Sequence, residues 1–494
     1  MRKKRLFWNT ISSLGNQIIT ILCGFILPRI ILGAYGSEVN GLVSSITQFL
    51  SIIAFLEFGV GAVVQSNLYQ PLAEQDGHTV SAVVRSSNRF FRRIAAIMAG
   101  YTLILMAVYP MIVRDFGFCF TAFLIFAMSI SSFAQYYFGI TNQLLLMADQ
   151  RAYIVSILQS ATVIANTVIC SLLICIGASI QSVKLTTSLI YLLRPLGLYL
   201  YVRKQYRIDR SVTYTAEPIR QKWNGLAQHI AAVVLDNTDT IVLTLFSTMR
   251  NVSIYSVYFL IIHGVKQMFL SMIRGIQSLL GELWARQERE ELRSTFAWTE
   301  WAIHTGVTYL FGCTAVLSVP FVRVYTAGIQ DADYVVPVFA AVLTLAHACH
   351  CLRLPYNIMV LAAGHYRQTQ QIYIAAAVIN IVVSVAAVKL FGLIGVAVGT
   401  LAAIVIQTVW LAHYMSAQLL NWPFRNTLRQ FFADGLTVIL ASLLSTRFEL
   451  EAVNYVAWLI LAVKIAVIWA VVLAGVNLIF YREKLLRLLG SVRH

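Results

Sequence analysis

Residues 371–416 read QIYIAAAVINIVVSVAAVKLFGLIGVAVGTLAAIVIQTVWLAHYMS, and Lys389 is the one Lys, Arg, Asp or Glu among them. An α-helix needs about 20 apolar residues to cross the ~30 Å hydrocarbon core of a bilayer. The stretch contains two such segments, 371–388 and 393–416, on either side of a short turn at Gly392. We therefore expect it to cross a membrane twice.

The rest of the chain has the same character. Of its 494 residues, 12% are charged and 59% are apolar, and the mean hydropathy is +0.74. Soluble domains carry about 25% charged residues, which cover their surfaces. The composition excludes a soluble enzyme, a disordered protein and a secreted disulfide scaffold. It indicates an integral membrane protein.

Fourteen segments are long and apolar enough to span a bilayer. They are predicted at 8–32, 42–65, 94–113, 119–146, 153–176, 182–202, 226–246, 252–280, 296–318, 334–361, 371–388, 393–416, 431–446 and 453–480. The thirteenth is the weakest, because it is short and carries Asp434. The predicted fold is an all-α integral membrane protein with about fourteen transmembrane helices.

Lysine and arginine are concentrated on one side of these segments. With the N-terminus placed in the cytoplasm, 25 of the 37 Lys and Arg residues fall in cytoplasmic segments, 6 on the opposite side and 6 within spans. This bias follows the positive-inside rule and predicts an even number of spans with both termini cytoplasmic. The net charge of +16 is attributed to topology and to anionic lipid head groups rather than to nucleic-acid binding.

The fifth and eleventh spans resemble each other. Asn166 and Gly177 correspond to Asn380 and Gly392, at offsets of 214 and 215 residues. The alternative is a chance similarity between two apolar helices. A repeat of this kind predicts two six-helix bundles, and paired halves form transporters that rock around a site near the membrane midplane.

The predicted boundaries follow from this repeat. The segment 203–225 is basic and polar, and it is interpreted as a cytoplasmic linker between the halves. The first bundle is then 1–202 and the second is 226–417. Residues 418–494 supply two additional helices and a cytoplasmic tail.

Several short motifs are similar to those of a known superfamily. They are Pro28-Arg29, Leu32-Gly33, GSEVNGL at 36–42, FLEFGVG at 55–61, NTDTIV at 237–242 and VSIYSV at 252–257. Their order along the predicted spans resembles the multidrug/oligosaccharidyl-lipid/polysaccharide exporter superfamily, and within it the Wzx-type flippases of polysaccharide biosynthesis.

The resemblance carries expectations about fold and function. It implies two bundles around a central cavity, in the cytoplasmic (inner) membrane of a bacterium. It implies a substrate of polyprenyl-pyrophosphate-linked oligosaccharide, moved from the cytoplasmic to the outer leaflet by alternating access for cell-surface polysaccharide biosynthesis. Membrane lipids and other polysaccharide-assembly membrane proteins are the implied partners. The same fold hosts drug exporters and the peptidoglycan lipid II flippase.

Cations within the spans are the candidates for substrate binding. A charge at the bilayer centre costs ~2.5 kcal/mol or more, so such side chains usually face protein or a wet cavity. Arginine offers a bidentate fork to phosphate oxygens, and lysine offers a point charge. The alternative is that these side chains extend to an interface or pair with an acid. The predicted substrate-binding residues are Arg29, Lys266, Arg274, Arg194 and Arg353.

Acids within the spans are the candidates for ion coupling. Asp236 and Asp239 are three residues apart and share a helix face. Two carboxylates in a low-dielectric site raise one pKa or hold a cation between them. We expect a Na⁺ or H⁺ coupling site there, completed by Asn380; the alternative is an ion pair with Arg29 or Lys266. Glu57 is predicted to hold a gate or to pair with an arginine.

No other cofactor is predicted. His347, His350 and Cys351 share one helix face, but one helix cannot supply a full tetrahedral site, so no metal site is expected. No nucleotide-binding motif is present. Two rival functions remain open. A cation-coupled multidrug exporter is disfavoured by deep cations, and a membrane glycan polymerase is disfavoured by the short outside loops, of which 319–333 is the longest.

Overall fold

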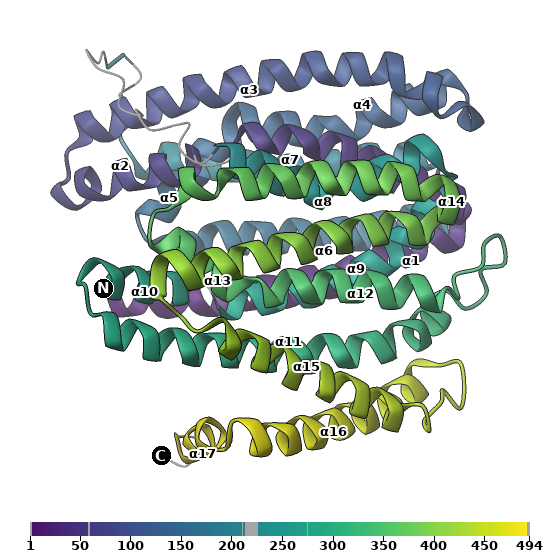
Figure 1. The fold of residues 1–494 in the computed structure, drawn as a ribbon. Coiled ribbons are helices and arrows are strands. Elements are labelled where there is room, and N and C mark those ends of the chain that lie inside the picture. Colours follow the sequence, from purple (N-terminus) through teal and green to yellow (C-terminus); the bar gives the residue numbers. More distant parts are fainter. Residues whose placement is uncertain (1, 58–59, 210, 213–225, 274, 492–494) are drawn as a thin grey trace. The chain divides into compact units, whose positions relative to one another are not determined.

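The computed structural model describes residues 2–57, 60–209, 211–212, 226–273 and 275–491 (Figure 1). Every regular element in these ranges is helical, which confirms the all-α prediction. The chain divides into two compact units, Met1–Ile230 and Ala231–His494. Most of the predicted linker, residues 213–225, lies outside the described residues.

The first unit is built from long helices joined by short turns. Its elements are α1 (Arg2–Ser51), η1 (Ile52–Leu56), α2 (Val60–Glu74), α3 (Gly77–Ile112), η2 (Arg114–Phe116), α4 (Phe118–Ala134), η3 (Gln135–Gly139), α5 (Ile140–Ala148), α6 (Ala152–Cys175) and α7 (Ile180–Gln205). Helix α1 packs along α6, and α4 packs against α3 and α7. The π-helical turn η3 joins α4 to α5, so that these three elements form one membrane pass.

The second unit follows the same plan. It begins within α8 (Leu226–Phe246), at Ala231. The elements that follow are α9 (Met249–Met272), α10 (Ile276–Ala285), α11 (Arg289–Tyr325), α12 (Pro337–Leu352), α13 (Leu354–Ala362), α14 (Tyr366–Tyr414), η4 (Met415–Leu420), α15 (Phe424–Ser445), α16 (Tyr455–Phe480) and α17 (Arg482–Ser491). Helix α14 packs against α12, and α11 packs against α12, α15 and α16. Helices α15 and α16 lie side by side at the C-terminal, yellow end of Figure 1.

Polar residues close the ends of the apolar helices. The Asp76 carboxylate accepts hydrogen bonds from the His78 and Thr79 amides at 3.0 and 3.1 Å, at the start of α3. Asn454 accepts from the Ala457 amide at 2.8 Å, at the start of α16. These caps satisfy amide groups that have no partner within the first turn of a helix.

Two helices are each long enough for two membrane passes. The apolar segments Phe7–Ser51 and Tyr366–Leu420 are interrupted at Gly36 (φ 80°, ψ 176°) and Gly392 (φ 54°, ψ −125°). Glycine adopts positive φ without the steric cost that a side chain brings. Eleven segments of the described chain qualify as spans; dividing these two and adding α8 gives fourteen passes. The number predicted from the sequence is confirmed.

Many large apolar side chains are exposed on the described helices, whereas polar groups lie inside. Leu390 and Ile479 are 77% and 75% exposed, while Asn380 and Gln407 are completely buried. In lipid, exposed polar groups have no water to bind, so polar side chains are satisfied inside the protein. The interior of each unit is therefore the place to look for a site.

The two matched spans also agree in structure. Asn166 on α6 and Asn380 on α14 are 4% and 0% exposed. Gly177 and Gly392, which follow them, both have positive φ, at 79° and 54°. Each glycine lies at the turn into the next pass. Shared burial and positive φ at matched positions support the predicted six-plus-six repeat.

Candidate functional site

Asp239 on α8 is held by hydroxyl groups from two other helices. Tyr255 on α9 donates a hydrogen bond to Oδ2 at 3.0 Å, and Thr400 on α14 donates to Oδ1 at 2.5 Å. The Asn380 amide, from the earlier pass of α14, donates to the Thr400 hydroxyl oxygen at 2.9 Å. Asp239 is 3% exposed. Thr400 thus joins two of the predicted ion-coupling residues.

One acceptor in this group is unsatisfied. Asn380 Oδ1 is buried and has no hydrogen-bond partner among the described residues. Leaving a buried acceptor without a partner costs about 1–3 kcal/mol. Hard cations take carboxylate, amide and hydroxyl oxygens as ligands, and these are the oxygens that Asp239, Asn380 and Thr400 supply. The residues therefore fit a small cation. The side chain of Asp236 lies outside the described part of the chain.

Asp239 and a buried lysine line the same small cavity. Lys266 on α9 is 2% exposed, and it lines this cavity together with Asp239, His347 and His350. The volume of this cavity is about 10 Å³, which is close to the minimum that one water molecule requires. A predicted substrate-binding cation and a predicted coupling acid thus line the same polar space.

Arg353 lies where one helix ends and the next begins. It follows α12, which ends at Leu352, and Pro355 occupies the first turn of α13. Its guanidinium donates a hydrogen bond to Gln407 on α14, and Nη2 lies 3.5 Å from His350 Nδ1. Arg353 is 6% exposed. This predicted cation is therefore buried inside the second unit.

Arg194 provides a deep cation in the first unit. Its Nη2 donates to Gln143 Oε1 at 2.8 Å, and Gln135 Nε2 donates to the same oxygen at 3.2 Å. Pro195 does not interrupt α7. At Gly139 a Cβ would lie 2.9 Å from Pro195 Cβ, so glycine permits the close approach of η3 and α7. Among the described residues, Arg194 contacts an amide and forms no ion pair with a carboxylate.

The remaining predicted residues are Arg29, Glu57 and Arg274. Arg29 is half-buried, and its Nη1 lies 3.1 Å from where a Cβ at Gly33 would be. Glu57 follows η1 and shares a hydrogen bond with Tyr136. Arg274 lies outside the described residues, so its pairing with Lys266 on one face stays a prediction.

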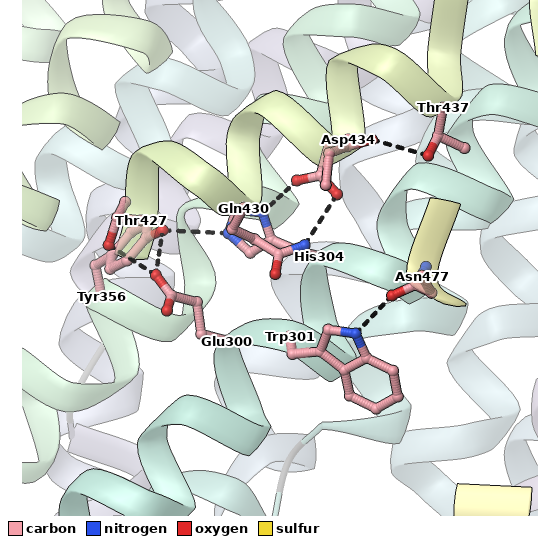
Figure 2. A network of polar contacts seen from close by, with 10 residues as sticks. Glu300, Trp301, His304, Tyr356, Thr427, Gln430, Asp434, Thr437 and Asn477 are labelled. Carbon is pink, nitrogen blue, oxygen red and sulfur yellow. Dashed lines mark hydrogen bonds and ion pairs between the residues drawn. The ribbon is translucent and has the colours of Figure 1, made fainter. Parts of the chain in front are cut away.

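Figure 2 shows a polar network that the sequence did not reveal. His304 Nδ1 on α11 lies 2.6 Å from Asp434 Oδ2 on α15, and Tyr356 on α13 donates to Glu300 Oε1 at 2.9 Å. Tyr356 also lies 3.2 Å from His304 Nε2, and Thr427 donates to Glu300 Oε1 at 2.9 Å. Asp434, which weakens the thirteenth predicted span, is therefore a buried partner of α11.

Sequence comparisons and structural comparisons differ in outcome. No family model and no curated protein matches the chain. Among solved structures, the lipid II flippase MurJ in an inward closed conformation matches with a TM-score of 0.70 and 13% identity, over 96% of this chain and 99% of that chain. An inward-facing MATE family transporter of the MOP superfamily matches with a TM-score of 0.62 and 14% identity, over 82% and 98%.

A third match is to a transporter whose binding pocket is described as having reverse polarity. It is a MOP superfamily transporter from Pyrococcus furiosus, for which reverse polarity of the binding pocket suggests a different function. The TM-score is 0.56 at 13% identity, over 84% of this chain and 96% of that chain.

The chain therefore shares the fold of the flippase MurJ and of a MATE family transporter of the MOP superfamily, which is the fold that the sequence resemblance predicted. The flippase MurJ matches nearly the whole chain, so the match includes most of residues 418–494. The two C-terminal helices are thus part of the shared architecture.

Proposed function

We propose that this protein is a flippase for lipid-linked oligosaccharide. It moves a glycan on a polyprenyl diphosphate from the cytoplasmic to the outer leaflet of a bacterial inner membrane by alternating access. The observation that carries the proposal is the burial of Lys266 and Arg353, at 2% and 6% exposure, within membrane-spanning segments. Buried cations at membrane depth mark substrate or ion pathways, and a diphosphate is an anion that such groups bind.

Arg194 supports the same substrate class from the first unit. Its hydrogen-bonding partner in the described chain is the neutral Gln143, so its charge is not compensated by a carboxylate. An arginine fork suits the oxygens of a phosphate group. The fold match to a lipid II flippase is consistent with a lipid-linked substrate.

Ion coupling at Asp239 is the second part of the proposal. A Na⁺ ion or a proton there would change the contacts between α8 and α14, because Thr400 donates to this carboxylate. A ligand that binds one arrangement of these helices better than another shifts the equilibrium between them. The site therefore offers a route from ion binding to a change within the second unit.

A cation-coupled drug exporter is the second candidate, favoured by the buried carboxylate of Asp239 and by the MATE fold match. The two functions require substrates of opposite charge. A cationic drug would meet repulsion from Lys266 and Arg353, whereas an anionic lipid would be attracted.

Reconstitution in liposomes tests the proposal. A polyprenyl-diphosphate sugar with a fluorescent label on the glycan is placed in the membrane, and an impermeant quencher reports how fast the label crosses. We expect the wild type to accelerate crossing and Lys266→Gln to slow it. Lys389→Gln is the control, because Lys389 lies at the turn between two passes, 5.8 Å from the Phe246 ring. Transport of a cationic dye without movement of the lipid would support the exporter instead.

A further inference from the structure

A large cavity inside the first unit is lined by arginine. Its volume is about 1030 Å³, and its walls come from α3, η3, α5, α7 and the residues that follow α7. Among the described residues, six arginines line it: Arg85, Arg89, Arg92, Arg93, Arg203 and Arg207. From the sequence these residues contributed only to the positive-inside count.

The helical repeat explains how four of these arginines reach one cavity. Positions 85, 89, 92 and 93 recur at intervals of three and four residues, so they lie on one face of α3. Arg203 is in the last turn of α7, and Arg207 lies just beyond it. Two segments of the first unit thus supply guanidinium groups to the same space.

The described lining contains one carboxylate, Asp209, which other groups already engage. The Ser211 hydroxyl and amide donate to Asp209 Oδ1 at 2.6 and 2.8 Å, and these bonds hold the pKa of Asp209 below its ordinary value. Arg85 donates to the Val212 carbonyl. In the described chain, no ion pair with a carboxylate is formed by Arg92, Arg93, Arg203 or Arg207. Six arginines and one aspartate give the described part of the lining a formal charge of +5.

Aromatic rings lie beside these charges. The Arg92 guanidinium lies 4.9 Å from the centre of the Tyr137 ring, a cation–π contact that restricts its orientation. Tyr199 and Tyr206 also line the cavity. Tyr206 is held by a hydrogen bond to Asp149 and by the Arg151 guanidinium 5.5 Å from its ring. The walls are therefore built from restrained side chains rather than from mobile surface residues alone.

We propose that this cavity binds the head group of a lipid that carries two phosphate groups. Arginine forks from α3 and from the end of α7 bind the phosphate oxygens, and the tyrosines contact the neutral part of the head group. Basic pockets between transmembrane helices on the cytoplasmic side bind phosphate-bearing head groups in this way. A lipid-linked sugar diphosphate and a two-phosphate phospholipid share this chemistry. The inference goes beyond the proposed function, because binding here does not require transport.

Equilibrium binding to the purified full-length protein in detergent tests the inference. The probe is radiolabelled polyprenyl diphosphate, and the variant is Arg92→Gln with Arg203→Gln. We expect binding to weaken at least about tenfold, since a hydrogen bond to a charged group contributes roughly that factor. The control is Arg114→Gln, which removes one positive charge from an exposed position of the same unit and should leave binding unchanged.

A second variant protects the test against misfolding. Arg92→Lys with Arg203→Lys keeps the charge but removes the forks, so we expect weakening of intermediate size. Equal binding by the wild type and both variants would overturn the site. Competition with cardiolipin and with inorganic diphosphate shows which part of the ligand the cavity recognises. If the phosphate groups alone are recognised, either competitor displaces the probe. If neither competitor displaces it, the cavity is not a phosphate site.

The binding proposal and the transport proposal can be refuted independently of each other. If the probe binds to wild type in an arginine-dependent manner but the liposomes show no flipping, the proposed function is wrong and the site stands. If flipping is observed and binding is independent of Arg92 and Arg203, the site is wrong and the proposed function stands.

Discussion

His304 Nδ1 on α11 lies 2.6 Å from Asp434 Oδ2 on α15, and both side chains are buried in the second unit (Figure 2). Gln430 Nε2 donates to the other Asp434 oxygen at 3.2 Å. Nearby, the Trp301 indole donates to Asn477 on α16 at 2.6 Å. These bonds join α15 and α16, the two helices beyond the six-plus-six repeat, to α11.

Replacing Asp434 with alanine should therefore destabilise the protein. His304 and Gln430 would lose a shared acceptor, and buried donors without partners cost about 1–3 kcal/mol each. We expect a lower melting temperature in detergent, measured by the fluorescence of a thiol-reactive dye. Asp115→Ala, at an exposed position in η2, is the control. Equal melting of the two variants would mean that the Asp434 carboxylate does not stabilise the network.

Gly312 on α11 permits contact with Trp469 on α16. A Cβ at Gly312 would lie 1.8 Å from Trp469 Cζ3, and the Trp469 ring is completely buried. Gly312→Ala should therefore destabilise the protein by about 1–3 kcal/mol through overpacking. Thermal melting and chromatographic homogeneity measure the effect.

Gly435→Ala is the matched control for Gly312→Ala. A Cβ at Gly435 would meet nothing within 4 Å, so alanine there should not lower stability, and its higher helix propensity favours the folded chain. If Gly312→Ala melts at the wild-type temperature, α16 tolerates displacement from α11, and the contact is not a constraint.

Lys484 on α17 predicts a pH dependence of stability. Its ammonium group donates to the Ala297 carbonyl at 2.7 Å, and partial burial lowers its pKa from 10.5 to about 8. The negative charge of Glu300 raises this pKa, and the positive charge of Arg429 lowers it. Below pH 8 both the folded and the unfolded chain carry the charge, so the cost of burial is fully present. As pH rises from about 8 to 10.5, the unfolded chain binds more protons, and the folded state gains stability.

The measurement compares melting temperatures of the wild type and Lys484→Met between pH 7 and 10.5. We expect the difference between them to favour the variant at pH 7 and to shrink as the pH rises. A difference that is constant across this range would contradict a lowered pKa for Lys484.

The sequence predicted the passes because each depends on local composition. The break at Gly392 separates two apolar runs, and Asn380 within the first run matches Asn166 at an offset of 214 residues. Lipid exposure imposes this signal on every span, so no knowledge of tertiary contacts is required. The short thirteenth span was identified for the same reason.

The partners of the polar residues could not be predicted in this way. Thr400 lies 161 residues from Asp239, and a threonine in an apolar helix carries no signal of its own. Asp434 made the thirteenth span a weak prediction, because the sequence does not show that its partner is His304 on another helix. The arginine-lined cavity was missed because the positive-inside rule counts the charges in a segment without showing which of them converge.

Asp239→Asn tests ion coupling directly. The amide keeps the shape of the side chain but removes the charge that would bind Na⁺ or accept a proton, so the rate of lipid crossing should lose its dependence on an imposed ion gradient. Thr400→Val removes the hydroxyl that links Asp239 to Asn380. For that variant we expect the half-saturating ion concentration to rise about tenfold or more.

Proteoliposomes with a Na⁺ gradient, a pH gradient or neither measure these effects. The control is Asp333→Asn, which removes one carboxylate charge from an exposed loop, where the side chain accepts a hydrogen bond from the Val335 amide. Dependence on Na⁺ alone identifies a metal-ion site, and dependence on pH alone identifies protonation of Asp239. If Asp239→Asn responds to both gradients as the wild type does, coupling occurs elsewhere, and the Asp239 carboxylate serves to hold α8 against α14.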